Sequence, residues 1–367
     1  MKNYIRFVCP VSGIAAFTLF SLAATQASAQ STKSIFPLLP PSVSTVPSNG
    51  DVNPYGVAFA PKTLIAGGGL QPGDILVSNF NNSQNLQGTG TTILRVDNTG
   101  ATSTFFTSSR GQGGLSAALG ILTNGWVLIG NLPTADGTSA TVLPGRLAVT
   151  DRFGNFLGTL GDPTTVNSPW GMAVYDTGSN GTGVAHIFLS NVLSGVVSRI
   201  DASYTPGGLQ ATATVLATGF THRPDAAALE LGPSGMAYNV ATNTLFVASS
   251  SDNAIYEIPT AATTFASVTP TLFFADPTHL HGPLDLAILP NGHFVVANSD
   301  GSNADPNQPS ELVEYSATGQ FLQQMSVNPN NGGAFGLAVN NMGWGTIRMA
   351  FVDDNTNTLR ISTTVVQ

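Results

Sequence analysis

The stretch that decides the fold is residues 281–299, HGPLDLAILPNGHFVVANS. Its apolar run at 284–289 is followed by a Pro-Asn-Gly turn at 290–292 and by a second apolar run at 293–297. Two short apolar runs around such a turn predict an antiparallel hairpin. Variants of this pattern occur six times along the chain.

Each copy of the pattern begins with a marker, usually a glycine followed by methionine, valine or leucine and then by alanine. The marker positions are Gly56, Ala118, Gly171, Gly235, Asp285 and Gly336. Their spacing of 50 to 64 residues leaves room for four short strands and their turns. Repetition of four-stranded units at such a period predicts an all-β fold, a six-bladed β-propeller.

The sixth copy ends before its fourth strand. The segment at 42–46, SVSTV, has the apolar alternation of a strand and precedes the first copy. We therefore expect this N-terminal strand to complete the last blade and close the ring, which removes two exposed sheet edges.

The composition excludes several classes of function. Only 9% of the 367 residues are charged, 42% are hydrophobic, and the formal net charge is -8. No basic stripe is present to neutralise phosphates, so we expect no nucleic-acid partner. The 40 glycines and 23 prolines suit many short strands joined by turns.

The N-terminus has the pattern of a signal peptide. Lys2 and Arg6 precede a short apolar run at 14–24, and the small residues at 27–29 form a cleavage site. We expect a signal peptide at 1–29, cut near Ala29, an extended leader at 30–41 and the propeller at 42–367. The sequence thus predicts a periplasmic or secreted protein, a monomer with no membrane span in its mature part.

The markers, turns and strands ending in a small polar residue resemble those of the NHL-repeat propellers. They also resemble the wider six-bladed group that contains the gluconolactonases. Gluconolactonase-like enzymes bind a divalent metal through Asn and Asp placed just before the marker. Here those positions hold mainly apolar residues, namely Tyr55, Ala117, Trp170, Ser234, Leu284 and Phe335. The resemblance therefore implies the architecture and leaves this metal site without its oxygen ligands.

The loops that lead into the first strands of the fourth and fifth blades carry the most reactive side chains. These candidates are His222, Arg223, Asp225, His279, His281 and Asp285. Neighbouring blades could bring them together, and His222, His279 and His281 would suit zinc or copper or acid–base chemistry. The alternative is that these residues cap turns and strand ends at the surface.

Asp285 is the sharper anomaly because it replaces a marker glycine at the channel wall. A charge placed there needs a partner. His281 and Arg223 are the candidate partners, in either a structural salt bridge or a functional site.

A polar residue ends the second strand of each copy. Five of these, Asn79, Asn131, Asn191, Asn298 and Asp353, are candidates for a channel-mouth binding site with Tyr55, Trp170 and Phe335. Aromatic faces beside amides suit a carbohydrate or a peptide. The alternatives are that the amides cap turns and that the aromatic rings plug the channel.

Two further patterns are weaker. Residues 300–307, DGSNADPN, are rich in the oxygen ligands of calcium but do not follow the EF-hand spacing. His186 and His293 begin second strands and are expected at the opposite face, as packing residues.

No Gly-x-Ser-x-Gly nucleophile motif is present in the sequence. The sequence therefore favours an exported scaffold that binds a protein, peptide or carbohydrate. The alternative is a lyase or hydrolase assisted by zinc, copper or calcium, with its site on blades four and five.

Overall fold

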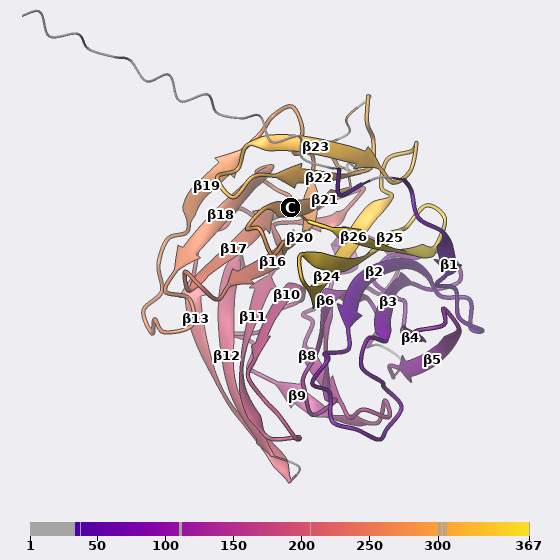
Figure 1. The fold of residues 1–367 in the computed structure, drawn as a ribbon, viewed down its shortest axis with the longest axis vertical. Helices are drawn as coiled ribbons and strands as arrows, with labels where there is room; N and C mark the ends of the chain where they lie inside the picture. Colours follow the sequence, from indigo (N-terminus) through magenta and orange to yellow (C-terminus); the bar gives the residue numbers. More distant parts are fainter. Residues whose placement is uncertain are drawn as a thin grey trace, which may run out of the picture. The chain divides into compact units, whose positions relative to one another are not determined.

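The computed structural model describes residues 34–36, 38–109, 112–205, 207–299, 302–303, 305 and 307–366. Six four-stranded antiparallel sheets, the blades, are arranged around a common centre (Figure 1). The predicted six-bladed propeller is confirmed. The described part of the chain holds one short 3-10 helix, Ser139–Thr141, and no helix with the length and hydropathy of a membrane span.

The first three blades follow one another along the chain, each running from an inner to an outer strand. Blade 1 contains β2 (Val52–Phe59), β3 (Ile75–Asn81), β4 (Thr92–Val96) and β5 (Thr102–Thr107). Blade 2 contains β6 (Leu115–Ile121), β7 (Val127–Asn131), β8 (Leu147–Thr150) and β9 (Phe156–Leu160). Blade 3 contains β10 (Pro169–Asp176), β11 (Gly183–Asn191), β12 (Val196–Thr205) and β13 (Gly208–Ala217).

The last three blades repeat this order. Blade 4 contains β16 (Pro233–Asn239), β17 (Thr244–Ser249), β18 (Ala254–Pro259) and β19 (Thr271–Ala275). Blade 5 contains β20 (Pro283–Ile288), β21 (Phe294–Asn298), β22 (Glu311–Tyr315) and β23 (Phe321–Ser326). Blade 6 contains β24 (Ala334–Gly343), β25 (Thr346–Asp353), β26 (Thr358–Val365) and β1 (Ser42–Ser44).

The N-terminal strand closes the ring as the sequence predicts. Strand β1 pairs antiparallel with β26, with Val43 opposite Leu359. Arg360 strengthens the joint by donating a hydrogen bond to the carbonyl of Pro40 at 2.8 Å. Blade 6 is therefore built from both ends of the described chain.

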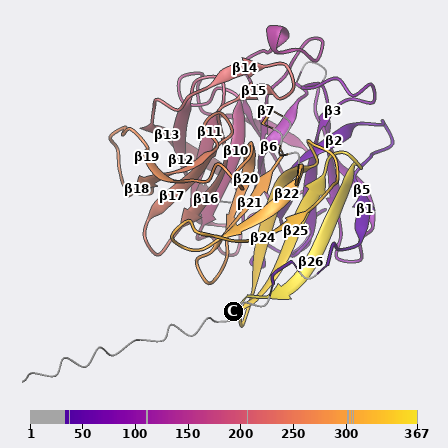
Figure 2. The ribbon, with the colours of Figure 1, turned by 90° about the horizontal axis from the view of Figure 1, so that it is seen from above.

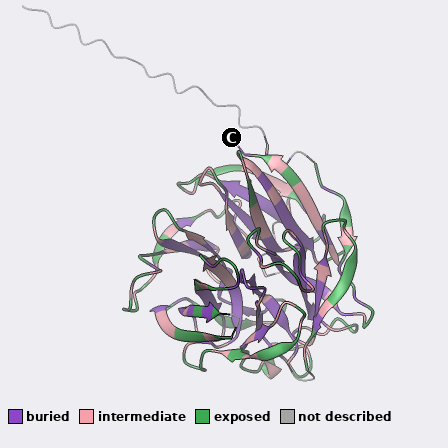
Figure 3. Cartoon of the chain, turned by 60° about the horizontal axis from the view of Figure 1, so that its bottom comes forward, coloured by how far each residue is buried: buried purple, intermediate pink, exposed green. Residues whose placement is uncertain are grey.

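The hydrophobic core lies between the blades. The second strands are almost completely buried, whereas the outer strands expose every second residue or more (Figure 3). Each of six apolar clusters joins two neighbouring blades, as Ile93 of blade 1 joins Leu119 of blade 2. The ring is stabilised by this face-to-face burial, which sets how closely the inner strands approach one another.

The marker glycines lie at the narrowest part of the ring, here called the neck. The inner strands of neighbouring blades contact each other all the way round. A Cβ at Gly171 would collide with the carbonyl of Ser234, and one at Gly336 with the carbonyl of Tyr55. The marker is glycine in four blades because backbone from the next blade fills the space of a side chain.

A belt of hydrogen bonds joins successive blades near the neck. Four serine hydroxyls donate to carbonyls of the next blade: Ser78 to Ser116 at 2.8 Å, Ser116 to Pro169 at 2.6 Å, Ser190 to Ser234 at 2.6 Å and Ser234 to Pro283 at 2.7 Å. Between blades 5 and 6, the N–H of Leu337 donates to Asp285 Oδ2 at 2.8 Å. The belt satisfies polar groups that have no access to water.

One element differs from the expected loops. The segment before blade 4 forms a hairpin of β14 (Arg223–Asp225) and β15 (Leu229–Leu231), seen at the upper side of the ring in Figure 2. We call this side the mouth face. Leu229 is 1% exposed and packs in the same apolar cluster as Tyr55 and Trp170, so the hairpin is anchored over the centre.

Candidate functional site

Aromatic rings fill the channel just inside the mouth face. Tyr55 stacks on Phe80 with centroids 4.4 Å apart and on Phe335 at 4.2 Å. Trp170 meets Tyr55 edge-on at 5.6 Å. Tyr55 and Trp170 are each only 3% exposed. The rings form a plug that is stabilised by burial and by their mutual geometry.

A pocket of about 250 Å³, the mouth pocket, lies above this plug. Tyr55, Trp170 and Phe335 line it, together with the starts of first strands and the residues after second strands. Its polar lining residues are Asn53, Asn81, Asn85, Gln87, Glu230, Ser250, Ser299, Ser302, Asn331, Asp354 and Asn355. An aromatic floor under a rim of amides and carboxylates is suited to hold a small polar molecule.

Asp354 is the first of two acidic groups in the mouth pocket. Loss of hydration, with a contribution from the charge of Asp353, raises the pKa of its carboxyl well above the ordinary value. In the amide orientation that satisfies its neighbours, Asn53 donates from Nδ2 to both Asp354 oxygens. The same amide accepts from Asn81 Nδ2 at 2.9 Å. Asp354 is therefore held by an amide rather than by a cation.

Glu230, on β15, is the second acidic group. It is 5% exposed, and burial raises the pKa of its carboxyl to about 7, with the charge of Arg223 acting in the opposite direction. His222 Nδ1 lies 3.8 Å from its Oε1. A carboxyl with such a pKa is divided between its acid and base forms near neutral pH.

Two buried amide oxygens of the pocket lack a hydrogen-bond donor. These are Asn81 Oδ1 and Gln87 Oε1, for which the described residues supply no partner. The nitrogen ends of both amides are engaged, by Asn85 at 2.7 Å and by the carbonyl of Ala227 at 3.1 Å. Buried acceptors are rarely left without a donor, so the pocket is chemically incomplete.

The predicted histidine cluster is not assembled. His222 faces Glu230, whereas His279 stacks on Phe321 of the outer strand of blade 5, with centroids 3.6 Å apart. His279 Nδ1 is 2.7 Å from Asp276, and His281 Nε2 is 3.2 Å from the carbonyl of Thr278. The three side chains therefore have separate environments.

Arg223 and Asp225 pair with each other, at 3.2 Å, within the β14–β15 hairpin. Asp225 Oδ1 also accepts hydrogen bonds from the N–H groups of Ala227 and Ala228, at 2.8 and 2.9 Å. Asp225 thus shapes the turn of the hairpin.

Asp285 does not pair with His281 or Arg223, so the predicted partners are wrong. Its carboxylate accepts the N–H of Leu286 at 2.8 Å and that of Leu337 in the next blade. Asp285 also lines a separate cavity of about 430 Å³ below the neck. The charge is met by backbone donors because both inner strands present N–H groups at the neck.

The polar residues that end the second strands do not line the mouth pocket, contrary to expectation. Asn79, Asn191, Asn298 and Asp353 are 0% exposed. The amides of Asn79, Asn131, Asn191 and Asn298 donate to carbonyls of the segment that leads into their own blade, and Asp353 accepts from Asn328 in the corresponding segment. These residues recur because each one hydrogen-bonds its blade to the segment that precedes that blade.

The remaining candidates lie elsewhere. His186 is 2.6 Å from Asp201 and His293 is 2.8 Å from Glu314, each within its own blade. In the segment proposed to bind calcium, positions 300, 301, 304 and 306 lie outside the described residues. Asp305 Oδ2 lies 3.9 Å from His281 Nε2.

The side chains do not fit a divalent metal site of the gluconolactonase type. The positions before the markers supply the aromatic plug, and the amide of Asn53 donates hydrogen bonds to both carboxyl oxygens of Asp354. Within the described ranges, no three His, Cys, Asp or Glu side chains are grouped closely enough to hold an ion. A hard cation needs several converging oxygens, which this set does not supply.

Sequence reasoning missed most of the polar rim. Asn81 lies two residues beyond Asn79, which was the predicted one. Asp354 likewise directly follows Asp353. Successive residues of a strand point to opposite faces, so the shift of one position from Asp353 to Asp354 exchanges a buried residue for a pocket residue. Asn81 lies on the same face as Asn79 but further along, at the last position of β3, where it reaches the pocket.

Comparison with known proteins gives the fold. No known family profile matches the sequence, and no curated protein matches it. A gluconolactonase from Xanthomonas campestris aligns over 89% of this chain and 98% of its own length, with 11% identity and a TM-score of 0.53. Regucalcin from Agrobacterium tumefaciens, described as a calcium-binding protein, aligns over 89% and 95%, with 12% identity and a TM-score of 0.50.

A Hadza microbial sialidase is also similar, over 86% of this chain and 66% of its own, with 11% identity and a TM-score of 0.51. At such identities the likeness concerns architecture. The chain therefore shares the six-bladed propeller fold of gluconolactonase and regucalcin.

Proposed function

We propose that this chain is an exported, NHL-like propeller that binds a small ligand rich in hydrogen-bond donors, such as a carbohydrate, in the mouth pocket. The observation that carries the proposal is the pair of buried amide oxygens, Asn81 Oδ1 and Gln87 Oε1, without donors among the described residues. Sugar hydroxyls or a peptide ammonium group would supply those donors.

The rest of the pocket supports the same ligand class. The carboxyls of Glu230 and Asp354 add acceptors, and no lysine or arginine lines the described pocket. The aromatic floor formed by Tyr55, Trp170 and Phe335 closes the pocket below, and Phe335 is the ring of this floor that is partly exposed to a ligand. The volume of about 250 Å³ suits one sugar unit or the end of a peptide.

The test is a saturation-transfer NMR screen of the purified protein against monosaccharides, disaccharides and short peptides, with and without calcium. Gln87→Ala should weaken a hit by roughly tenfold, because one buried hydrogen bond is lost. Gln320→Ala, a matched change of an exposed glutamine on blade 5, should leave affinity unchanged. Equal affinity for both variants would remove the mouth pocket from the proposal.

A hydrolase or lyase is the second candidate, favoured by one observation. Glu230 combines burial, a pKa of about 7 and a place at a pocket, which are properties of a general acid or base. The likeness to a gluconolactonase makes a sugar lactone the first substrate to test. Turnover lost in Glu230→Gln would favour the enzyme, and turnover unchanged in that variant would exclude Glu230 from catalysis.

A further inference from the structure

A second cavity lies on the side of the ring and shares no lining residue with the mouth pocket. This side cleft has a volume of about 260 Å³ and is formed by the outer strand of blade 1, the connection that follows it, and blade 2. Its described lining consists of Phe106, Thr107, Ser108, Ser109, Gln112, Leu115, Ile129, Asn131, Arg146, Ala148, Phe156 and Thr159. Residues 110 and 111 lie outside the described part of the chain and are not included.

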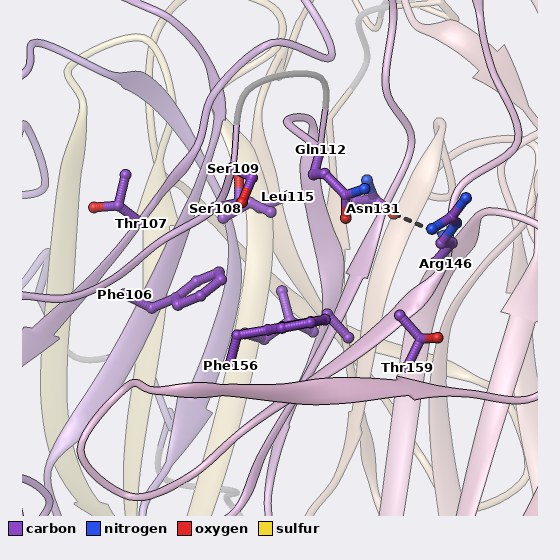
Figure 4. A pocket seen from close by; sticks show the side chains of 12 residues that line it. Phe106, Thr107, Ser108, Ser109, Gln112, Leu115, Asn131, Arg146, Phe156 and Thr159 are labelled. Carbon is purple, nitrogen blue, oxygen red and sulfur yellow. Dashed lines mark hydrogen bonds between the residues drawn. The ribbon is translucent and has the colours of Figure 1, made fainter.

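The cleft has one polar side and one apolar side. Figure 4 shows Ser108, Gln112 and Arg146 along one side and the rings of Phe106 and Phe156 along the other. Phe156 is 56% exposed, a high value for a ring beside a cavity, whereas Phe106 is 8% exposed. A molecule that fills the cleft must therefore be polar at one end and flat and apolar at the other.

Arg146 gives the polar side its charge. It is the only charged residue of the described lining, and the described residues place no carboxylate in ion-pair contact with its guanidinium. Its N–H donates to Asn131 Oδ1 at 2.7 Å, and its side chain is exposed at the edge of the cleft. A guanidinium binds a carboxylate through two parallel N–H···O bonds.

Ser108 is an independent sign of a missing ligand. Its Oγ is buried at the cleft, and the described residues offer it no hydrogen-bond partner. Gln112 brings an amide to the same side (Figure 4). A hydroxyl that lacks both water and a protein partner is rare, and a carboxylate oxygen is a strong acceptor for it.

We infer that the side cleft is a binding site for a small monocarboxylate with a flat apolar body, such as an aromatic acid. Arg146 and Ser108 hold the carboxylate, and the body lies against Phe106 and Phe156. The cavity holds about nine waters at liquid density, which corresponds to on the order of ten non-hydrogen atoms of ligand. This site is separate from the mouth pocket and does not depend on what binds there.

The experiment is calorimetric titration of the purified protein at low salt with phenylacetate and with its neutral isostere, phenylacetamide. Phenylacetate should bind saturably, and phenylacetamide should bind at least roughly tenfold more weakly because it cannot form the charged pair. Arg146→Gln and Ser108→Ala should each weaken phenylacetate, Arg146→Gln by roughly tenfold to a hundredfold. Phe156→Ala should weaken both compounds.

The matched control is Arg223→Gln, which removes the same charge at the mouth face and should leave phenylacetate binding unchanged. A thermal melt of each variant shows that it is folded. The inference is overturned if phenylacetate does not bind saturably, or if folded Arg146→Gln binds it as tightly as the parent. Tighter binding of glucuronate than of phenylacetate would overturn the assignment of an apolar body.

Discussion

Asp285 shows how one residue can depart from a repeat without breaking it. Four blades have glycine and one has alanine at this position, where backbone of the next blade approaches closely. At Asp285 the carboxylate meets this backbone as a hydrogen-bond acceptor, from the N–H of Leu337, and so takes part in the belt between blades. The cost is an acidic group that is only partly hydrated.

This cost gives the stability of the protein a pH dependence. Loss of hydration raises the pKa of Asp285 to about 7, opposed by the two backbone hydrogen bonds. A raised pKa means that the folded state binds the proton more tightly than the unfolded state. The contribution to stability is therefore complete below about pH 4 and is lost as the pH rises through about 7.

Asp285→Ala should remove the loss of folding stability that the parent shows as the pH rises through about 7. Urea unfolding at pH 4.5, 6 and 7.5 should show that the free energy of unfolding of the parent falls relative to the variant, by on the order of 2–3 kcal/mol across the range. Glu230 and Asp354 titrate in both proteins, so the difference isolates Asp285. Parallel pH profiles would show that the carboxylate is hydrated at the neck.

The sequence predicts the odd residue but not its partner. The alignment of six copies identifies Asp285 at once, because the other five positions hold glycine or alanine. Its contact with Leu337 depends on how close blades 5 and 6 approach, which no local pattern encodes. The sequence does not predict Glu230 as a site residue either. The segment before blade 4 has no counterpart in the other copies, and its β14–β15 hairpin is defined by tertiary packing.

The belt of serines operates between elements. Ser190 Oγ donates to the carbonyl of Ser234 at 2.6 Å and accepts the N–H of Gly171 at 2.9 Å, so one hydroxyl joins blades 3 and 4. Ser190→Ala leaves both backbone groups buried without a partner, which should cost about 2–4 kcal/mol. Ser203→Ala, on an exposed part of β12 in the same blade, should cost less than about 0.5 kcal/mol. Equal unfolding midpoints in urea for these two variants would contradict the role of the belt.

Strand β1 should act as the lock of the ring. Removing residues 34–44 exposes the edge of β26, since β1 is its outer partner in the sheet. Compared with a chain that starts at residue 34, the truncated chain should melt several degrees lower and should self-associate through the free edge. Calorimetry and light scattering measure the two effects. An unchanged melting temperature with a monomeric chain would show that closure is dispensable.

At the scale of the whole molecule, the repeat predicts the architecture but does not predict the function. The spacing of the six copies and their shared marker predict the ring of blades. The absence of a fourth strand in the sixth copy predicts that the N-terminal strand closes the ring, because an unpaired sheet edge would otherwise remain. The repeat also predicts the wrong binding residues. The recurring Asn79, Asn191 and Asn298 donate hydrogen bonds to the segments that lead into their own blades. The pocket is formed instead by residues that recur less regularly, such as Gln87 and Glu230. The pocket residues lie at positions where the copies differ in sequence. Only the folded ring shows that these residues come together.

Export is a prediction at the same scale. If residues 1–29 are a signal peptide, the mature chain begins at Gln30 and retains the full propeller. N-terminal sequencing of the protein recovered from the periplasm or the medium should give Gln30 as the first residue. Recovery of the chain in the cytoplasm with Met1 intact would contradict export.

The most direct test of the central claim is a crystal structure of the protein soaked with the tightest binder from the saccharide and peptide screen. We predict ligand density in the mouth pocket above Tyr55, with ligand donors within hydrogen-bond distance of Asn81 Oδ1 and Gln87 Oε1. A ligand bound elsewhere, with both oxygens left to water, would contradict the claim that this pocket is the binding site.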